Sequence, residues 1–250
     1  MPNTKPKVIL LRHTFQPEEL VAMAAKLCYS RADVEDLKAG IEAKDQTRFL
    51  QKLIEMGHES TMEHASFTFA ISGVSRSFLA QITRHRIASF SVQSQRYVGQ
   101  KRDEGEFNYI MPPAIAALGE EAQEKFHAQM AMMQTWYNEW VDLLGDAGEK
   151  SNEDARFVLP NAAETRMLMT MNVRELRHFF GLRCCRRAQW EIRQVAWMML
   201  EECRRACPVL FANAGPGCLR GACPEGSKSC GQAALVREQS RLLDEAIKGE

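Results

Sequence analysis

Hydrophobic and polar residues alternate along this chain with two different periods, which predict where strands and helices form. Residues 66–72 alternate apolar and polar side chains and are rich in strand-forming types, so we expect a strand with one buried face. The short apolar run at residues 8–11 is typical of a buried strand. Residues 164–171 combine methionine and threonine and fit either period, and we favour a strand there.

Apolar residues at helical spacing predict most of the remaining elements. The segments with this spacing are residues 17–29, 45–56, 75–85, 173–182 and 188–207. Residues 112–148 are expected to form two helices broken near Gly119, and residues 152–159 can form a short helix that ends at Pro160. Residues 211–231 hold five glycines, two prolines and three cysteines, so they are predicted to be irregular.

The predicted elements mix helices with a few strands that do not alternate strictly along the sequence. This arrangement favours the α+β class, with a small antiparallel sheet packed by several helices. We expect a main domain over residues 1–213, followed at residues 214–250 by a cysteine- and glycine-rich tail with a terminal helix.

Composition agrees with a soluble globular protein. Hydrophobic residues make up 45% of the chain and charged residues 26%. No uninterrupted apolar run approaches the roughly 20 residues that cross a bilayer, and the first residues lack the pattern of a secretory signal. We therefore expect a cytoplasmic protein without a membrane partner.

Positive charge is concentrated in two places although the formal net charge is +0. Six arginines and no lysine lie between residues 172 and 193, and four more arginines lie between residues 84 and 102. A balanced net charge argues against a general nucleic-acid-binding protein, which normally carries a basic excess. Two arginine clusters in a neutral chain favour a focused anion site. The alternative for each arginine is a solvated or ion-paired position on a helix surface.

The run Arg84-His85-Arg86, followed after seven residues by Ser94, is the most informative motif. A guanidinium group binds phosphate through two parallel hydrogen bonds, a geometry that lysine cannot reproduce. Such a mixture of polar groups suits a phosphorylated ligand better than a core. Taken alone, the Arg-His-Arg triplet is also compatible with side chains that cap the last carbonyls of a helix.

With Gln81 three positions before Arg84, and with Gln-Arg-Tyr at residues 95–97, this motif resembles the signature of flavin-dependent thymidylate synthases. Other segments resemble that family in the same order, at residues 57–60, 155–160, 172–178 and 182–193. The chain departs from many members at Val92, where they carry an acid or amide, and at Arg186-Arg187, where they carry Ser-His. The chain is identified as a member of this family.

The resemblance implies roles for the residues at matching positions. Those implied to contact dUMP are Gln81, Arg84, Gln93, Ser94, Gln95, Arg96, Arg156 and Arg183. Those implied to contact FAD are Ser60, Arg84, His85, Arg86, Ile87, Asn172, Arg174 and His178. Arg183 is implied to be catalytic, because its counterpart faces N3 of the pyrimidine, where a permanently charged guanidinium stabilises negative charge. A local alternative for Ser60 is a capping box with Glu63.

The implied reaction is the reductive methylation of dUMP to dTMP. Methylenetetrahydrofolate donates the carbon, FAD carries the hydride and NADPH is the reductant. No protein nucleophile is needed, so Ser94 is interpreted as a ligand-positioning hydroxyl. The resemblance also implies a homotetramer with shared active sites and no nucleic-acid partner. The alternative from another class is an arginine-rich nucleic-acid-binding module whose cysteines hold zinc.

Eight cysteines in a cytoplasmic chain are more often thiols or metal ligands than disulfides. Cys28 is predicted to lie in a helix core, and Cys203 and Cys207, one turn apart, are predicted to pack. The tail cysteines lack any apolar period, and four thiolates would form a tetrahedral zinc site. The predicted ligands are Cys185, Cys218, Cys223 and Cys230, with Cys184 as the alternative to Cys185. Metal and free thiols stay equally open, with disulfides as a third alternative.

Overall fold

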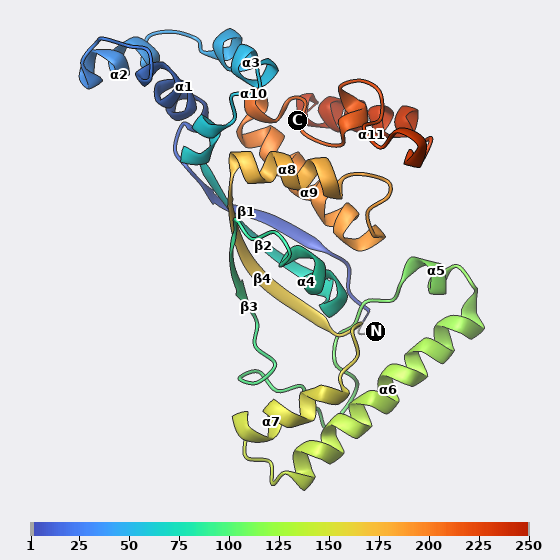
Figure 1. Ribbon diagram of the computed structural model, residues 1–250. Coiled ribbons are helices and arrows are strands. Elements are labelled where there is room, and N and C mark those ends of the chain that lie inside the picture. Colours follow the sequence, from blue (N-terminus) through green and yellow to red (C-terminus); the bar gives the residue numbers. More distant parts are fainter. Residues whose placement is uncertain (1–2, 250) are drawn as a thin grey trace. The chain divides into compact units, whose positions relative to one another are not determined.

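The protein is described by a computed structural model that covers residues 3–249 (Figure 1). The chain divides into two compact units. The first unit comprises the segment up to Lys7, Ile71–Arg84 and Phe90–Leu168, and the second comprises Val8–Ala70, His85–Ser89 and the chain from Met169 onward. Each unit is therefore built from segments that are far apart in sequence.

One four-stranded antiparallel sheet is present, with the strand order β1-β2-β4-β3. The strands are β1 (Lys7–His13), β2 (Ser66–Ser75), β3 (Ser89–Val92) and β4 (Glu164–Asn172). The predicted strands β1, β2 and β4 are confirmed, including the ambiguous segment at residues 164–171. Strand β3 was not predicted, because its four residues are too few to establish a period of two. The predicted α+β class is confirmed.

Strand β2 shows how side-chain alternation fixes the register of the sheet. Phe67, Phe69 and Ile71 are fully buried, while the residues between them are half-buried. Within the second unit, the hydroxyl groups of Thr68 and Thr170 form a hydrogen bond of 2.9 Å across β2 and β4. A shift of one residue would turn the phenylalanines away from the core, so burial specifies this register.

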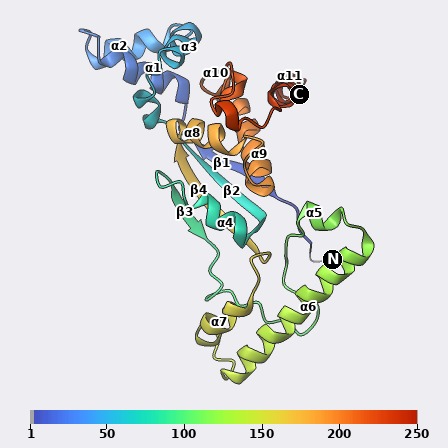
Figure 2. The same ribbon diagram turned by 45° about the vertical axis from the view of Figure 1, so that its right-hand side comes forward.

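The first unit contains the helices around the long middle region of the chain (Figure 2). They are α4 (Arg76–Ile82), α5 (Pro113–Ala116), α6 (Glu120–Leu143), α7 (Glu149–Ala155) and the 3-10 turn η2 (Arg156–Val158). The predicted break falls at Gly119, whose φ of 102° is accessible mainly to glycine. Helices α6 and α7 pack around the buried Tyr137, whose hydroxyl donates to Asn152 Oδ1 at 3.0 Å.

The second unit contains most of the remaining helices. They are α1 (Pro17–Leu27), α2 (Val34–Glu42), α3 (Thr47–Glu55), η1 (Ser60–His64), α8 (Val173–Arg183), α9 (Trp190–Ala206), α10 (Pro208–Phe211), η3 (Gly217–Leu219), η4 (Gly226–Lys228) and α11 (Ala233–Lys248). Helix α2 was not predicted. It buries only Leu37 and Ile41 and contains Gly40, so its sequence signal is weak.

The chain beyond residue 213 is part of the second unit, where α11 contacts α9 and η3. The terminal helix predicted for this region is present, and the segment before it consists mostly of short turns, as expected. The division into domains at residues 1–213 and 214–250 remains a prediction. Within residues 3–249, no helix has both the length and the apolar composition needed to cross a membrane.

Candidate functional site

Helix α8 begins at a side-chain cap formed by one of the residues predicted to contact FAD. Asn172 Oδ1 accepts a hydrogen bond of 2.8 Å from the backbone N–H of Glu175, which is a standard way to satisfy the first turn of a helix. Arg174, in the same turn, is exposed and forms an ion pair with Glu63 of η1. His178 follows one turn later and is also exposed, so Arg174 and His178 share one side of α8.

A chain of three polar side chains, two of them buried, connects α8 to the Arg-His-Arg motif. His85 Nδ1 lies 3.1 Å from Glu175 Oε1, and Arg183 Nε donates to His85 Nε2 at 3.0 Å. Because Nε2 accepts from Arg183, the proton of a neutral imidazole must be on Nδ1, which then donates to Glu175. The arrangement therefore fixes both the tautomer of His85 and the orientation of the Arg183 guanidinium.

The environment of His85 favours its neutral form. Burial lowers the pKa of His85, and the nearby Arg183 charge lowers it further, although the hydrogen bond that His85 donates to Glu175 acts in the opposite direction. The ring is also packed against Phe179, with ring centroids 4.9 Å apart. A neutral imidazole can accept the Arg183 hydrogen bond, whereas an imidazolium cannot.

The lowered pKa of His85 predicts that the protein loses stability as the pH falls. Below the ordinary histidine pKa of 6.5 the unfolded chain binds a proton at this position while the folded chain resists it, so acidification favours unfolding. We expect urea denaturation between about pH 5 and pH 8 to show that the free energy of unfolding decreases as the pH is lowered. This decrease should be steeper in the wild type than in His85→Gln. Equal pH dependence in the two proteins would contradict this environment.

Ser60 lies at an open cavity of about 520 Å³ in the second unit. Helix η1 begins at Ser60, which is exposed, and His58 and Arg174 line the same cavity. The capping box considered for Ser60 and Glu63 is not formed: Glu59 is the cap residue, it makes no side-chain cap, and Glu63 pairs with Arg174 instead. Ser60 is therefore placed at a ligand-sized opening rather than in a helix cap.

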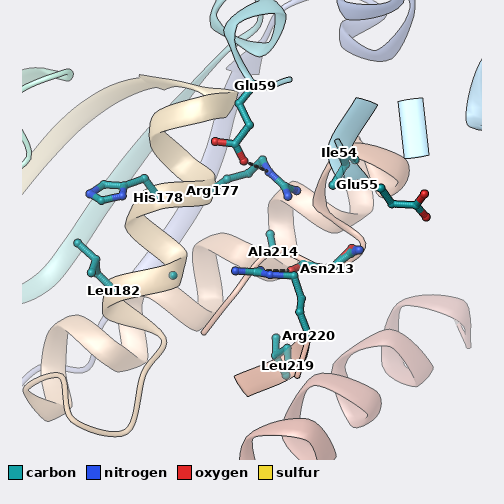
Figure 3. Close-up of a pocket in the computed structure, with 11 residues that line it drawn as sticks. Ile54, Glu55, Glu59, Arg177, His178, Leu182, Asn213, Ala214, Leu219 and Arg220 are labelled. Atoms are coloured by element: carbon teal, nitrogen blue, oxygen red, sulfur yellow. Dashed lines mark hydrogen bonds and ion pairs between the residues drawn. The ribbon is translucent and has the colours of Figure 1, made fainter. Parts of the chain in front are cut away.

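A second cavity, of about 840 Å³, lies beside helix α8 (Figure 3). Arg177 is its most buried charged group, with only 8% of its side chain exposed. Its Nε lies 3.6 Å from Glu59 Oε1, and its terminal nitrogen donates to the backbone oxygen of Leu210. Burial lowers the pKa of Arg177, and the charge of Arg220 lowers it further while Glu59 opposes both. Arg177 thus holds α8 against η1 and α10.

The first unit contains most of the residues predicted to bind dUMP. Gln81 is half-buried near the end of α4, and Arg84 follows in the turn, where its backbone N–H donates to the Gln81 carbonyl at 3.3 Å. Arg84 is exposed, as expected for a residue that meets a ligand. In the second unit, Arg86 and Ile87 are also exposed, with 66% of Ile87 accessible.

Ser94 organises the turn that follows β3. Its hydroxyl accepts hydrogen bonds from the backbone N–H groups of Arg96 at 3.1 Å and Tyr97 at 3.4 Å. Among residues 3–249, no histidine or carboxylate bonds to this hydroxyl, so nothing activates it as a nucleophile. Gln93 and Gln95, on either side, are half-buried. The geometry agrees with the interpretation of Ser94 as a positioning group.

Arg96 lies opposite two acids of α7 within the first unit. Its guanidinium is 2.6 Å from Glu149 and 3.6 Å from Glu153, and it donates to the Tyr97 hydroxyl at 2.7 Å. Arg156 is anchored nearby, where its Nε donates to the Glu153 carbonyl at 3.0 Å. The structure therefore brings Arg96 and Arg156, which are 60 positions apart in sequence, to the same short helix α7.

The predicted zinc site is not formed. Three of its cysteines, Cys185, Cys218 and Cys223, line a cavity of about 360 Å³ in the second unit, while Cys230 is exposed. Over residues 3–249, no three histidine, cysteine or acidic side chains are grouped as metal ligands would be. Burial raises the pKa of the Cys218 thiol, and the neighbouring cysteines raise it further.

The environments of the eight free thiols predict which of them react. Cys184, Cys203 and Cys207 are buried, and desolvation raises their pKa values strongly, whereas Cys28 and Cys230 are exposed. Cys203 and Cys207 pack as predicted, but Cys28 does not lie in the core. Iodoacetamide followed by peptide mass spectrometry should modify Cys28 and Cys230 in the folded protein, and Cys184, Cys203 and Cys207 only after denaturation. Fast labelling of Cys203 in the native state would contradict this packing.

Comparison with known proteins identifies the family. Residues 9–209 match the profile of the family described as thymidylate synthase complementing protein. A flavin-dependent thymidylate synthase from Geobacter sulfurreducens is 49% identical over 237 residues, which cover 95% of this chain and 99% of that protein. The chain belongs to the flavin-dependent thymidylate synthase family. The family member from Clostridium tetani is 46% identical, with 93% of this chain and 96% of that protein covered.

The fold agrees with this family. A crystal structure of flavin-dependent thymidylate synthase ThyX from Helicobacter pylori, complexed with FAD and dUMP, matches with a TM-score of 0.60 and 24% identity. The match covers 84% of this chain and 99% of that chain. The resemblance to flavin-dependent thymidylate synthases drawn from the sequence motifs is therefore confirmed.

One residue at the site of this family member was missed by sequence reasoning. Glu175 was counted only as one of two acids within the second arginine cluster, yet it is buried and bonds to His85. A signal was present in the helical pattern, because Glu175 lies one turn before Phe179 on the buried face of α8. An acid at a core position needs a specific partner.

Proposed function

We propose that the chain catalyses the reductive methylation of dUMP to dTMP, as its family name implies. The observation that carries this proposal is the fixed guanidinium of Arg183 at the end of α8, held through Nε by the buried His85. A permanently charged group in a fixed orientation can stabilise negative charge on N3 or O4 of a pyrimidine without changing its own protonation. Arg183 is thus proposed as the catalytic residue.

The dUMP phosphate is proposed to bind among the arginines and the serine turn of the first unit. Arg84 is exposed at the end of α4, and Ser94 presents a hydroxyl in the loop beside Arg96. Glu149 and Glu153, which pair with Arg96 here, leave its guanidinium half-exposed, so a phosphate can compete for it. The full proposed set is Gln81, Arg84, Gln93, Ser94, Gln95, Arg96, Arg156 and Arg183.

The donor groups in this chain fit FAD as the hydride carrier. The exposed guanidiniums of Arg86 and Arg174 suit a diphosphate, and Ser60 and His178 each line a cavity large enough for part of a cofactor. When bound, the flavin supplies the hydride that reduces the transferred carbon. The proposed FAD set is Ser60, Arg84, His85, Arg86, Ile87, Asn172, Arg174 and His178.

The remaining parts of the reaction are proposed from family membership. They are NADPH as reductant, methylenetetrahydrofolate as carbon donor, a homotetramer whose active sites are shared between copies, and a cytoplasmic location. In a shared site, residues of another copy complete the cofactor pocket. Dilution below the dissociation constant of the tetramer would therefore reduce activity.

The visible absorption spectrum tests the proposal against its alternative. A flavoprotein is yellow, and anaerobic NADPH should bleach its long-wavelength band. The nucleic-acid-binding alternative predicts a colourless protein whose binding to DNA or RNA falls steeply with salt. A protein that stays colourless after incubation with FAD, and that retains no flavin on gel filtration, would contradict the proposed function.

Replacing Ser94 by alanine should weaken dUMP binding more than it slows the chemical step. The hydroxyl caps a turn and positions a ligand, so its loss costs roughly one hydrogen bond to a charged group, about 1.5–3 kcal/mol, which is on the order of a 10- to 100-fold increase in KM. Steady-state kinetics at saturating dUMP should recover most of the turnover. Complete loss of turnover at saturation would show that Ser94 takes part in the chemistry.

A further inference from the structure

We infer that Glu175 and His85 form a positioning relay that holds the guanidinium of Arg183 in its working orientation. The inference rests on the proposed function, in which Arg183 acts on the pyrimidine. It assigns a role to Glu175, and it adds to the FAD contact proposed for His85 a role in which its ring acts through Arg183.

The relay connects different parts of the second unit. Glu175 lies in the first turn of α8, Arg183 is the last residue of the same helix, and His85 comes from the loop after α4. Glu175 and Arg183 are eight positions apart, more than two helical turns, so they cannot be expected to contact each other directly. The imidazole of His85 spans this distance, with 3.1 Å to Glu175 and 3.0 Å to Arg183.

Both ring nitrogens of His85 are used by protein partners. Arg183 Nε, which always carries a proton, donates to Nε2, and this leaves Nδ1 protonated and bonded to Glu175. His85 is only 6% exposed and its ring makes an edge-to-face contact with Phe179. A buried imidazole with both nitrogens occupied cannot also hydrogen-bond a flavin through its ring.

The helix dipole favours an acid in the first turn of α8, but a solvent-exposed carboxylate would serve that purpose as well as the buried Glu175. Leu176, Phe179 and Phe180, its neighbours on the buried side of α8, are apolar, and Glu175 itself is only 9% exposed. The backbone cap of α8 is provided by Asn172, so the helix does not need the Glu175 side chain for its first turn. A buried acid costs free energy unless it is bonded, and its bond here is to the ring that orients Arg183.

The relay has an electrostatic consequence for the pH dependence of the reaction. The carboxylate of Glu175 favours protonation of His85, whereas burial and Arg183 oppose it. Once His85 is protonated, Nε2 carries a hydrogen and repels the Arg183 donor, so the guanidinium is released. The acid limb of the pH profile of kcat should therefore follow His85. In Glu175→Gln this limb should move to lower pH, because the charge that favours protonation is gone.

Two substitutions at Glu175 separate a positioning role from a structural one. Glutamine keeps an oxygen that can accept from His85 Nδ1, whereas leucine keeps only the volume. We expect Glu175→Leu to lower kcat about 10- to 100-fold, the effect typical of removing a partner that orients a working group, with little change in the KM for dUMP. Glu175→Gln should recover most of this loss and show the shifted acid limb.

Asp244→Asn is the matched control. Asp244 pairs at 2.9 Å with Arg204, a buried arginine of the same unit that is not part of the proposed site. This variant removes a carboxylate from a buried arginine and should lower stability without changing kcat or its pH profile. If Glu175→Leu does not fold, the pH profile of kcat in Glu175→Gln still tests the relay. A kcat of Glu175→Leu within about twofold of the wild type would overturn the relay, and so would an unmoved acid limb in Glu175→Gln.

A spectroscopic measurement tests the relay without any activity. In the free protein labelled with ¹⁵N-histidine, the His85 signals, assigned by their loss in His85→Gln, should show the tautomer protonated at Nδ1. An Nε2-protonated ring would overturn the inference. Wild-type protein that makes no dTMP but shows this tautomer would contradict the proposed function and leave the geometry intact. Active wild type with an unaffected Glu175→Leu would contradict the relay alone.

Discussion

Arg183→Ala is expected to abolish dTMP formation while the protein remains folded. The side chain is the last residue of α8, it is half-buried, and its Nε is already held by His85. Removing a fixed group that stabilises developing charge typically slows an enzyme by about 100- to 1000-fold. Product formation at saturating substrates, together with circular dichroism, would measure both parts of the prediction.

Two further variants sharpen this test. Arg183→Lys should also be nearly inactive, because an ammonium group on a flexible chain cannot reproduce the planar, oriented fork. Arg187→Ala is the matched control, since Arg187 is exposed near the same helix end and pairs with Glu225 instead. Near-normal turnover in Arg183→Ala would remove Arg183 from the mechanism, and equal losses in Arg187→Ala would indicate a general effect of charge.

Arg204→Ala is expected to cause the largest loss of stability among single substitutions in the second unit. Its guanidinium, 3% exposed, donates to the backbone oxygens of Phe211 and Ala214 and pairs with Asp244 of α11. The substitution would leave two buried carbonyls without their donor, and breaking such a network costs about 3–5 kcal/mol. Urea denaturation monitored by tryptophan fluorescence would measure the shift in the free energy of unfolding.

Helix α11 also provides a control for Arg204→Ala. Arg241 pairs with Glu238 and Glu245 on the surface of α11, where water screens the charges, so Arg241→Ala should leave the unfolding midpoint almost unchanged. If Arg204→Ala were as stable as Arg241→Ala, α11 would not be held to α9 by this network.

The fold could be predicted where the sequence carries a sustained period. Strand β2 and helices α6 and α9 repeat their apolar positions over many residues, so each local pattern agrees with its final burial. Strand β3 and helix α2 could not be predicted in this way. The first has only four residues, and the second buries two side chains, so their formation depends on neighbours that the local sequence does not reveal.

The candidate site was predictable as a set of residues but not as a set of contacts. The family motifs identified Arg84, His85, Ser94 and Arg183, yet nothing in their spacing indicated that His85 is buried between Glu175 and Arg183. Such a contact joins residues about 90 positions apart and depends on tertiary packing. The tail cysteines illustrate the converse limit, because their clustering in sequence suggested a metal site, whereas over residues 3–249 no three possible ligands are grouped as a metal would need.

The most direct test of the account is the formation of dTMP by the purified protein. With dUMP, methylenetetrahydrofolate, NADPH and FAD together, we expect the protein to form more moles of dTMP than there are moles of enzyme. Omission of NADPH should stop turnover, and the Arg183→Ala protein should form no product under the same conditions. Absence of dTMP from folded wild-type protein that has bound FAD would contradict the proposed function.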